Sequence, residues 1–314
     1  MIGRAMNFAR WQVAKRVGRQ LPVVLMYHRV ADLTLDHYHL AVSPARFEQQ
    51  IAALVKVRKV VPLEQLLDAP EDGEALAAIT FDDGYRDVVT NALPVLERHA
   101  CPATLFLSTA MVGSAREFWW DELVRIVFET TLTQEVELDV LRSGRKWRIG
   151  PATRRADRAR VVEELSGVLR YLPVQSRANA IARMAAACGI DLAMRDSHAI
   201  VTADEVRALD GTLLSIGAHS QHHVSLRQCD AATQVREING SRDDCEKLTG
   251  RVPKTFAYPF GDYDPRVVER VREAGFAAAV TVDRRLLRPD GDPLMLPRIE
   301  VRDWSVQDLM RRLP

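Results

Sequence analysis

Two adjacent carboxylates that follow an apolar strand constrain this chain more than any other feature. The apolar run Ala77 to Phe81 is typical of a buried parallel strand, and Asp82, Asp83 and Gly84 follow it directly. Active-site residues of α/β proteins commonly lie at the carboxyl end of a strand. Because neighbouring side chains leave an extended backbone in different directions, one aspartate can bind a metal while the other handles a proton. A plain turn between a strand and a helix is the alternative.

A histidine pair far downstream favours the metal site. His219 and His223 follow a second apolar run, Leu213 to Gly217. At this i, i+4 spacing both imidazoles would lie on one face of a helical turn and reach one divalent cation. A carboxylate and two imidazoles form a facial set of ligands that leaves positions for water and substrate. Two surface histidines on a helix are the alternative, and the combination with the two aspartates outweighs it.

Three short motifs resemble those of a known enzyme family. Thr80-Phe-Asp-Asp-Gly84 and His219-Ser-Gln-His-His223 resemble the first two motifs of the polysaccharide deacetylase family, and Tyr258-Pro-Phe-Gly261 resembles the third. The similarity covers residues 22 to 112 and 200 to 301, in the family's usual order. These enzymes are metal-dependent hydrolases that remove acetyl groups from amino sugars. The resemblance implies an α/β fold, a distorted (β/α) barrel of about seven parallel strands with a mostly helical insertion.

The resemblance also implies a metal and its ligands. By the family's pattern the second aspartate of the pair, Asp83, binds the ion together with His219 and His223, and the first, Asp82, is the general base. One divalent ion is expected. Zinc is the default for two imidazoles and a carboxylate, and cobalt, nickel or manganese would fit the same ligands.

The third motif is expected to contribute backbone geometry. In the family the amide N–H at the position of Phe260 points at the developing oxyanion, and Pro259 and Gly261 would fix that turn. Tyr258 and Pro259 are expected to contact the substrate.

The chain departs from the family's pattern at two places. An arginine that orients the base usually precedes the third motif, but Ala257 occupies that position, and Arg298 near the end of the last strand is the best replacement. The family's general acid is commonly a late histidine, and no histidine follows His223. The segment Leu25-Met-Tyr-His-Arg29 resembles a deacetylase branch with an early Tyr-His motif, so His28 is the candidate acid and His222 the weaker alternative.

The order of apolar and polar segments predicts one domain, residues 21–314, preceded by a basic segment, residues 1–20. The alternation of strands and helices stops in residues 112–200, which are interpreted as a mostly helical insertion. Trp119 and Trp120 begin a helix there and are candidates for stacking on a sugar or a lipid; anchoring the insertion is the alternative. The basic segment is compatible with an amphipathic helix on an anionic membrane, or with a packed or frayed terminus.

Composition excludes several classes of protein. With 43 basic and 42 acidic residues no global field attracts nucleic acid. Its four cysteines have no zinc-ribbon or disulfide spacing. No apolar run of about 20 residues predicts a transmembrane helix, and no secretory signal is evident. We therefore expect a cytoplasmic protein, with peripheral contact to the inner membrane surface as an extension; the sequence carries no signal for oligomeric state.

The leading hypothesis is a carbohydrate N-deacetylase that acts on an amino sugar of a cell-surface polysaccharide or its lipid-linked precursor. A second hypothesis keeps the chemistry and changes the substrate to a small or lipid-linked amide or formamide. A third is a catalytically silent sugar-binding relative, motivated by the missing arginine and the missing late histidine. The presence of both aspartates and both histidines argues against the third hypothesis.

Overall fold

The computed structural model describes residues 21–67, 75–140, 146–209, 211–288 and 291–314, so the basic segment 1–20 lies outside the described residues. The chain divides into two compact units. One contains the chain up to Val112 and again from Val201 to Pro314, and the other is Gly113–Ile200. The smaller unit coincides with the segment in which the sequence loses its alternation of strands and helices.

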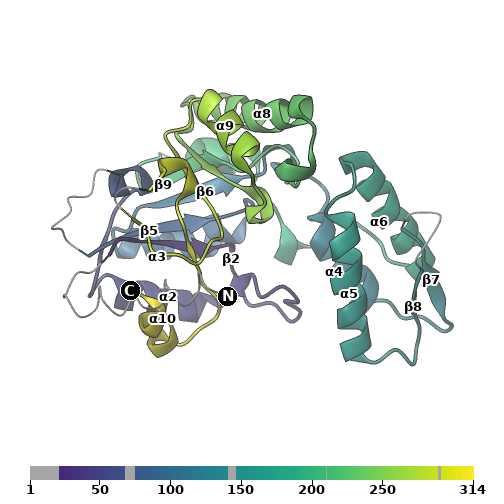
Figure 1. The fold of residues 1–314 in the computed structure, drawn as a ribbon. Coiled ribbons are helices and arrows are strands. Elements are labelled where there is room, and N and C mark those ends of the chain that lie inside the picture. The colour runs from purple at the N-terminus through teal and green to yellow at the C-terminus, as the bar shows by residue number, and fades with distance from the viewer. Residues whose placement is uncertain (1–20, 68–74, 141–145, 210, 289–290) are drawn as a thin grey trace, which may run out of the picture. The chain divides into compact units, whose positions relative to one another are not determined.

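A curled parallel sheet forms the centre of the larger unit (Figure 1). Its strands follow the order β11-β10-β9-β6-β5-β1-β12, and β4 also pairs with β5. These strands are β1 (Val23–Tyr27), β4 (Lys59–Val60), β5 (Leu76–Phe81), β6 (Ala103–Leu107), β9 (Leu214–Ala218), β10 (Thr255–Ala257), β11 (Ala278–Val280) and β12 (Ile299–Glu300). The pair β2 (Arg29–Val30) and β3 (Ala41–Val42) lies apart from this sheet. The predicted distorted (β/α) barrel is confirmed.

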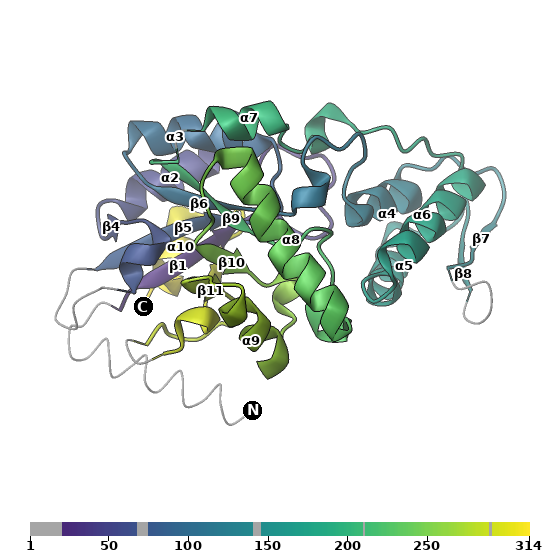
Figure 2. The same ribbon diagram turned by 90° about the horizontal axis from the view of Figure 1, so that it is seen from above.

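Helices cover the outside of the curled sheet (Figure 2). They are α2 (Pro44–Leu54), α3 (Leu93–Arg98), α7 (Ala203–Ala208), α8 (Ala231–Thr249), α9 (Pro265–Glu273) and α10 (Val306–Arg312), and a π-helical turn, Val88–Ala92, leads into α3. Short 3-10 turns of the larger unit lie at Leu63–Leu66, Thr109–Met111, Leu226–Gln228, Pro259–Gly261 and Pro293–Met295, and one of the smaller unit lies at Asp196–His198. A capping box begins α7, since the side chains of Thr202 and Glu205 each accept a hydrogen bond from the other residue's backbone N–H.

Strand β5 shows how the sheet delivers side chains to two faces. Phe81 points outward, where its ring lies 5.8 Å from that of Phe47 on α2. Ala78 packs inside the barrel with Phe106 of β6 and other buried apolar residues. Because side chains alternate along a strand, the residues two and four positions after Ala78 also face inward. The inward row of β5 therefore ends at Asp82.

The smaller unit is mostly helical. It contains α4 (Trp119–Phe128), α5 (Arg155–Leu169), α6 (Val174–Cys188) and an antiparallel pair, β7 (Val136–Leu138) with β8 (Trp147–Ile149). The sequence around Ser143-Gly144 predicts a small hairpin here. Its two strands are present, and Ser143-Gly144 itself lies outside the described residues. Among the described residues no helix is both long and apolar enough to cross a membrane.

Candidate metal and active site

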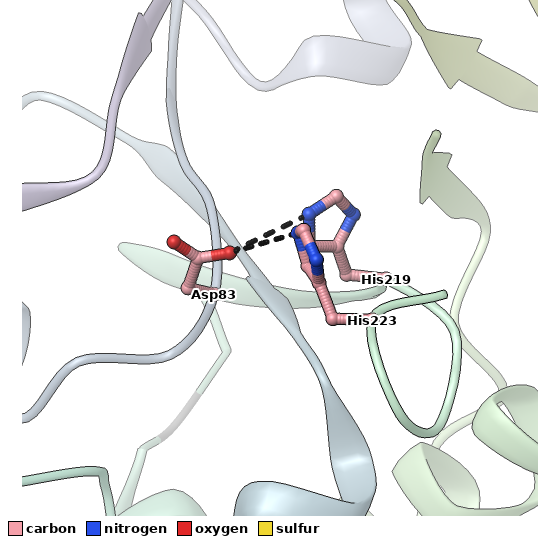
Figure 3. A group of neighbouring side chains, drawn as sticks. All are labelled: Asp83, His219 and His223. Atoms are coloured by element: carbon pink, nitrogen blue, oxygen red, sulfur yellow. Dashed lines mark ion pairs between the residues drawn. The ribbon is translucent and has the colours of Figure 1, made fainter. Parts of the chain in front are cut away.

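Three buried side chains from two strand ends converge at one point (Figure 3). Asp83 follows β5, and His219 and His223 follow β9. The Oδ1 atom of Asp83 lies 3.7 Å from Nε2 of His219 and 3.3 Å from Nε2 of His223. One ligand atom from each residue lies within 4.8 Å of the others, which is the spacing of a group that shares one ion. The predicted ligand set is therefore assembled.

The donor atoms of this cluster suit a divalent metal. Asp83 Oδ1 is buried and accepts no hydrogen bond from the residues that the structure describes. His219 Nδ1 lies 2.8 Å from the carbonyl oxygen of Ala257, an arrangement that fixes the tautomer and leaves the Nε2 lone pair toward Asp83. A buried carboxylate oxygen that faces two imidazole nitrogens is the ligand chemistry that zinc and similar ions prefer.

The backbone of the site departs from regular geometry. Asp83, Ser220, His223 and Phe260 all have positive φ, between 48° and 76°. For residues other than glycine each such conformation costs about 1–3 kcal/mol, and residues in such conformations cluster at functional sites. Gly84 follows with φ 99°, and a Cβ there would lie 2.9 Å from Cδ2 of Leu107. The left-handed turn after β5 therefore places the carboxylate of Asp83 beside His219 and His223.

The histidine pair corrects a sequence-based expectation. We predicted a helical turn for His219 to His223, but this segment is an irregular loop, with Ser220 at φ 58° and His223 at φ 48°. The imidazoles converge because two residues adopt the left-handed conformation. Their rings pack edge to face, with centroids 4.7 Å apart. The two histidines come together as expected, but through left-handed backbone conformations and not through a helical turn.

Asp82 forms a buried bidentate ion pair with Arg298. Nη1 of Arg298 donates to Oδ1 of Asp82 at 2.7 Å, and Nη2 donates to Oδ2 at 2.6 Å. The guanidinium also donates to Oγ1 of Thr80 and to the carbonyl oxygen of Thr281. Arg298 thus occupies the barrel interior and holds the carboxylate that the inward row of β5 presents.

Charges around the site keep both aspartates ionised. Burial would raise the pKa of Asp82, but the Arg298 guanidinium and the nearby His219 and His28 outweigh it and hold the pKa well below its usual range. For Asp83, burial is opposed by His223, His28 and His219, and the pKa is again lowered. Burial is the largest influence on His219 and lowers its pKa to about 4. A neutral imidazole is the form that binds a metal.

His28 lies at the same strand-end level as Asp82. In the parallel pairing of β1 and β5, Tyr27 is aligned with Phe81, and the N–H of Asp82 donates to the carbonyl oxygen of Tyr27. The charge of His28 contributes to the lowered pKa of both aspartates. The side chain is partly exposed. The structure therefore brings His28 close to both aspartates.

An ion pair between the buried Arg29 and the partly buried Asp87 joins the chain just after His28 to the chain just after Asp83. Nε and Nη2 of Arg29 donate to Oδ2 of Asp87, at 3.0 and 2.9 Å, and the N–H of Val30 donates to its Oδ1. The guanidinium also lies 4.2 Å from the ring centroid of Tyr85. Since Arg29 follows His28 directly, this contact ties the end of β1 to the turn after β5.

The third motif is only partly placed as predicted. Phe260 lies beside His223, one of the candidate metal ligands. The two rings pack edge to face with centroids 4.3 Å apart, and the left-handed backbone of Phe260 makes the turn. Tyr258 is fully buried, and its hydroxyl donates to the carbonyl oxygen of Leu294. Pro259 is also buried. The prediction that Tyr258 contacts the substrate is therefore wrong, because its side chain belongs to the core behind the turn, and Pro259 offers little surface to a ligand.

The two tryptophans lie in the smaller unit. Trp120 is buried and stacks on Phe118, with ring centroids 4.4 Å apart. Its ring therefore packs inside the insertion, which corrects the prediction that it stacks on a substrate. Trp119 packs edge to face against Trp120, and the Arg177 guanidinium lies 5.4 Å from its centroid. Substrate stacking by Trp119 stays a prediction.

The model of a family described as polysaccharide deacetylase matches residues 69–132 and 179–279, together more than half of the chain. Among curated proteins, the poly-beta-1,6-N-acetyl-D-glucosamine N-deacetylase of Staphylococcus aureus (strain MRSA252) is 24% identical over 100 residues, which cover 30% of this chain and 34% of the relative. The chain thus spans about a third of the length of the curated relatives it matches.

Solved structures share the fold over nearly the whole chain. The Streptococcus pyogenes deacetylase PplD, solved in complex with acetate, is 17% identical with a TM-score of 0.62, and the alignment covers 94% of this chain and 98% of that one. IcaB from Ammonifex degensii is 18% identical with a TM-score of 0.59, covering 94% and 97%.

Proposed function

Because the chain belongs to the polysaccharide deacetylase family, we propose that it is a metal-dependent hydrolase that removes N-acetyl groups from an amino sugar of a glycan. The observation that carries this proposal is the buried set Asp83, His219 and His223. The ion pair of Asp82 with Arg298 supports it, because a silent protein has no need of a buried carboxylate held beside an assembled ligand set.

Hydrolysis of an acetamide needs an activated water, a polarised carbonyl and a proton for the departing amine. Asp83, His219 and His223 would hold a divalent ion, and that ion would supply the Lewis acidity needed to polarise the carbonyl and acidify water. Asp82, held ionised by Arg298, accepts the proton of the attacking water. The bidentate contact fixes the direction in which that carboxylate can accept a proton.

Two further residues complete the proposed reaction. The left-handed turn at Phe260 lies against His223, so the amide N–H of Phe260 is proposed to donate to the oxygen that becomes negative as water attacks. His28, aligned with Asp82 at the end of β1, is proposed to give its proton to the amine nitrogen as the C–N bond breaks. Acetate and the free amino sugar are the products.

The similar proteins suggest a class of substrate. The Staphylococcus aureus relatives are named for poly-beta-1,6-N-acetyl-D-glucosamine. We therefore propose a polymer of N-acetylated glucosamine, or its lipid-linked precursor, as the substrate of this chain. We propose zinc as the metal ion, because two imidazoles and a carboxylate are typical zinc ligands.

Acetate release tests the proposal directly. The protein, with its metal content measured, is incubated with N-acetylated β-1,6-linked glucosamine oligosaccharides. We expect acetate from the parent and about 10²-fold less from Asp82→Asn, which keeps the side-chain shape but cannot accept the proton. Equal release by both proteins would contradict the assignment. Formate release from an N-formylated sugar without acetate release would favour a deformylase, and binding without hydrolysis would favour a silent relative.

A second proposal concerns the membrane. Residues 1–20 contain five basic and no acidic residues, a composition that attracts an anionic lipid surface. We expect the protein to co-sediment with anionic liposomes at low salt, and a variant without residues 1–20 to stay in the supernatant. Failure of the full chain to co-sediment would remove this proposal. The proposal that the protein acts at the cytoplasmic face of a membrane would then lose its support.

A further inference from the structure

The loop that carries both histidine ligands is bound along one face of α8. Glu237, Gly240 and Asp244 are spaced i, i+3, i+7, so they share a face of this helix. Figure 2 shows α8 running beside β9, the strand that leads into the loop. All three residues meet the segment Gln221-His222, which lies between the two ligands.

Glu237 is the centre of this contact. Its carboxylate is buried, and Oε2 accepts hydrogen bonds from the backbone N–H groups of Gln221, at 3.0 Å, and His222, at 2.9 Å. Oε1 lies 2.8 Å from Nδ1 of His222. One side chain thus bonds two consecutive peptide groups of the metal-binding loop. A charged acceptor makes such bonds stronger than a neutral one would.

Gly240 leaves room for the side chain of Gln221 against the helix. Glycine is a poor residue for the middle of a helix, yet a Cβ at this position would lie 2.4 Å from Cδ of Gln221. The amide of Gln221 cannot move away freely, because its Nε2 donates to Oδ2 of Asp244 at 2.8 Å. Thr109 Oγ1 donates to the same oxygen. The helix surface is therefore shaped to the loop.

The opposite edge of the loop is held by the segment after β6. The N–H of Thr109 donates to the carbonyl oxygen of Ser220, and the N–H of Ala110 donates to that of Gln221. With Ser220 and His223 in the left-handed conformation, the loop has no helical hydrogen bonds of its own. Its shape therefore depends on these two neighbouring elements.

We propose that Glu237 is a positioning residue for the metal site, which holds the His219–His223 loop in the strained shape that aims both imidazoles at one ion. This inference rests on the proposed metal-dependent function. It extends that function to a residue outside the set of three candidate ligands. Loss of a group that orients metal ligands typically weakens metal binding by about 10- to 100-fold.

The test measures metal affinity on the full chain. Equilibrium dialysis with Co²⁺ should give a dissociation constant about 10- to 100-fold higher for Glu237→Ala than for the parent. The visible absorption spectrum of bound Co²⁺ should also change, because the angle between the ligands changes. Glu237→Gln should recover most of the affinity, since its amide oxygen can still accept both backbone N–H groups. Glu246→Ala removes an exposed glutamate of the same helix and serves as the matched control.

Two further variants keep the outcomes distinct. Gly240→Ala retains the Glu237 carboxylate and improves helix propensity, so it tests the loop's position without unfolding the helix. We expect it also to weaken Co²⁺ binding. Parent-like affinity and spectra in both Glu237→Ala and Gly240→Ala would overturn the inference. If His219→Ala itself keeps the parent's affinity, the metal site fails instead, and with it the proposed function.

Discussion

The guanidinium of Arg298 binds both carboxylate oxygens of Asp82 inside the barrel, at 2.7 and 2.6 Å. Each side chain is almost completely buried. Arg298 precedes β12, which pairs with β1, and β1 in turn pairs with β5. The arginine thus reaches Asp82 from two strands away, and Ala257 leaves the position before the third motif without a guanidinium.

Arg298→Lys should lower kcat/KM by about 10²-fold or more while the metal stays bound, since small displacements of a catalytic group have this effect. An ammonium keeps the charge but cannot donate two parallel hydrogen bonds to the carboxylate. Steady-state kinetics and metal analysis of the same preparation check this expectation. Arg302→Lys alters a partly exposed arginine paired with Glu300 and is the control. Parent-like turnover of Arg298→Lys would show that the ion pair does not serve catalysis.

Replacement of either histidine ligand should remove the metal. His219→Ala and His223→Ala each take away one of the three donors that lie within 4.8 Å of one another. We expect both purified variants to contain little metal by elemental analysis and to have no measurable activity. His99→Ala, which alters a histidine paired with Glu48, should retain the parent's metal content. Full metal content in both ligand variants would disprove the site.

Most of this site was predictable because it lies at strand ends. The carboxyl ends of parallel strands meet at one edge, so apolar runs that end in Asp82, His219 and His28 are enough to place these residues together. Arg298 was predictable for the same reason, together with the arginine missing at Ala257. These expectations followed from the order of the strands and from a small set of polar residues at their ends.

The remainder depended on contacts that a sequence pattern does not contain. The left-handed conformations of Ser220 and His223 arise where α8 and the segment after β6 hold the loop, so the i, i+4 spacing alone suggested a helical turn. Tyr258 was misassigned because a motif does not say which of its side chains face the core. The bond of its hydroxyl to Leu294 depends on a segment 36 residues away.

The stability of the smaller unit should depend on pH through Glu117. Burial would raise the pKa of this carboxyl, but two hydrogen bonds from the Arg195 side chain and one from its backbone N–H outweigh it, and the pKa is lowered. A lowered folded-state pKa adds stability above the unfolded value, near 4.5, and that stability is lost as the pH falls below it.

The difference in free energy of unfolding between the parent and Glu117→Gln should therefore shrink as the pH falls from neutral to about 3. Tryptophan fluorescence during denaturant unfolding follows the transition, since Trp119 and Trp120 begin the helix after Glu117. Glu135→Gln, at an exposed position, is the control. A difference that is constant over this range would show that Glu117 titrates alike in the folded and unfolded chain.

His28→Ala should keep its metal and its fold while turnover falls by about 10²-fold or more, the usual scale for loss of a positioned acid. His28 is the residue best placed to protonate the amine, because it is aligned with Asp82 across β1 and β5 and its charge acts on both aspartates. His222, the alternative, contacts Glu237 through Nδ1 and is exposed. Its bond to Glu237 turns that nitrogen toward α8.

The pH dependence of the rate separates an acid from a residue that only shapes the site. A general acid must carry its proton in order to act, so a fall of activity at high pH that depends on this acid should be absent in His28→Ala. His37→Ala, in the loop after β2, should keep the parent's profile. A substrate whose leaving amine needs no protonation should be hydrolysed by His28→Ala at nearly the parent rate. If His28→Ala instead hydrolyses the glycan at the parent rate, the proton comes from another donor.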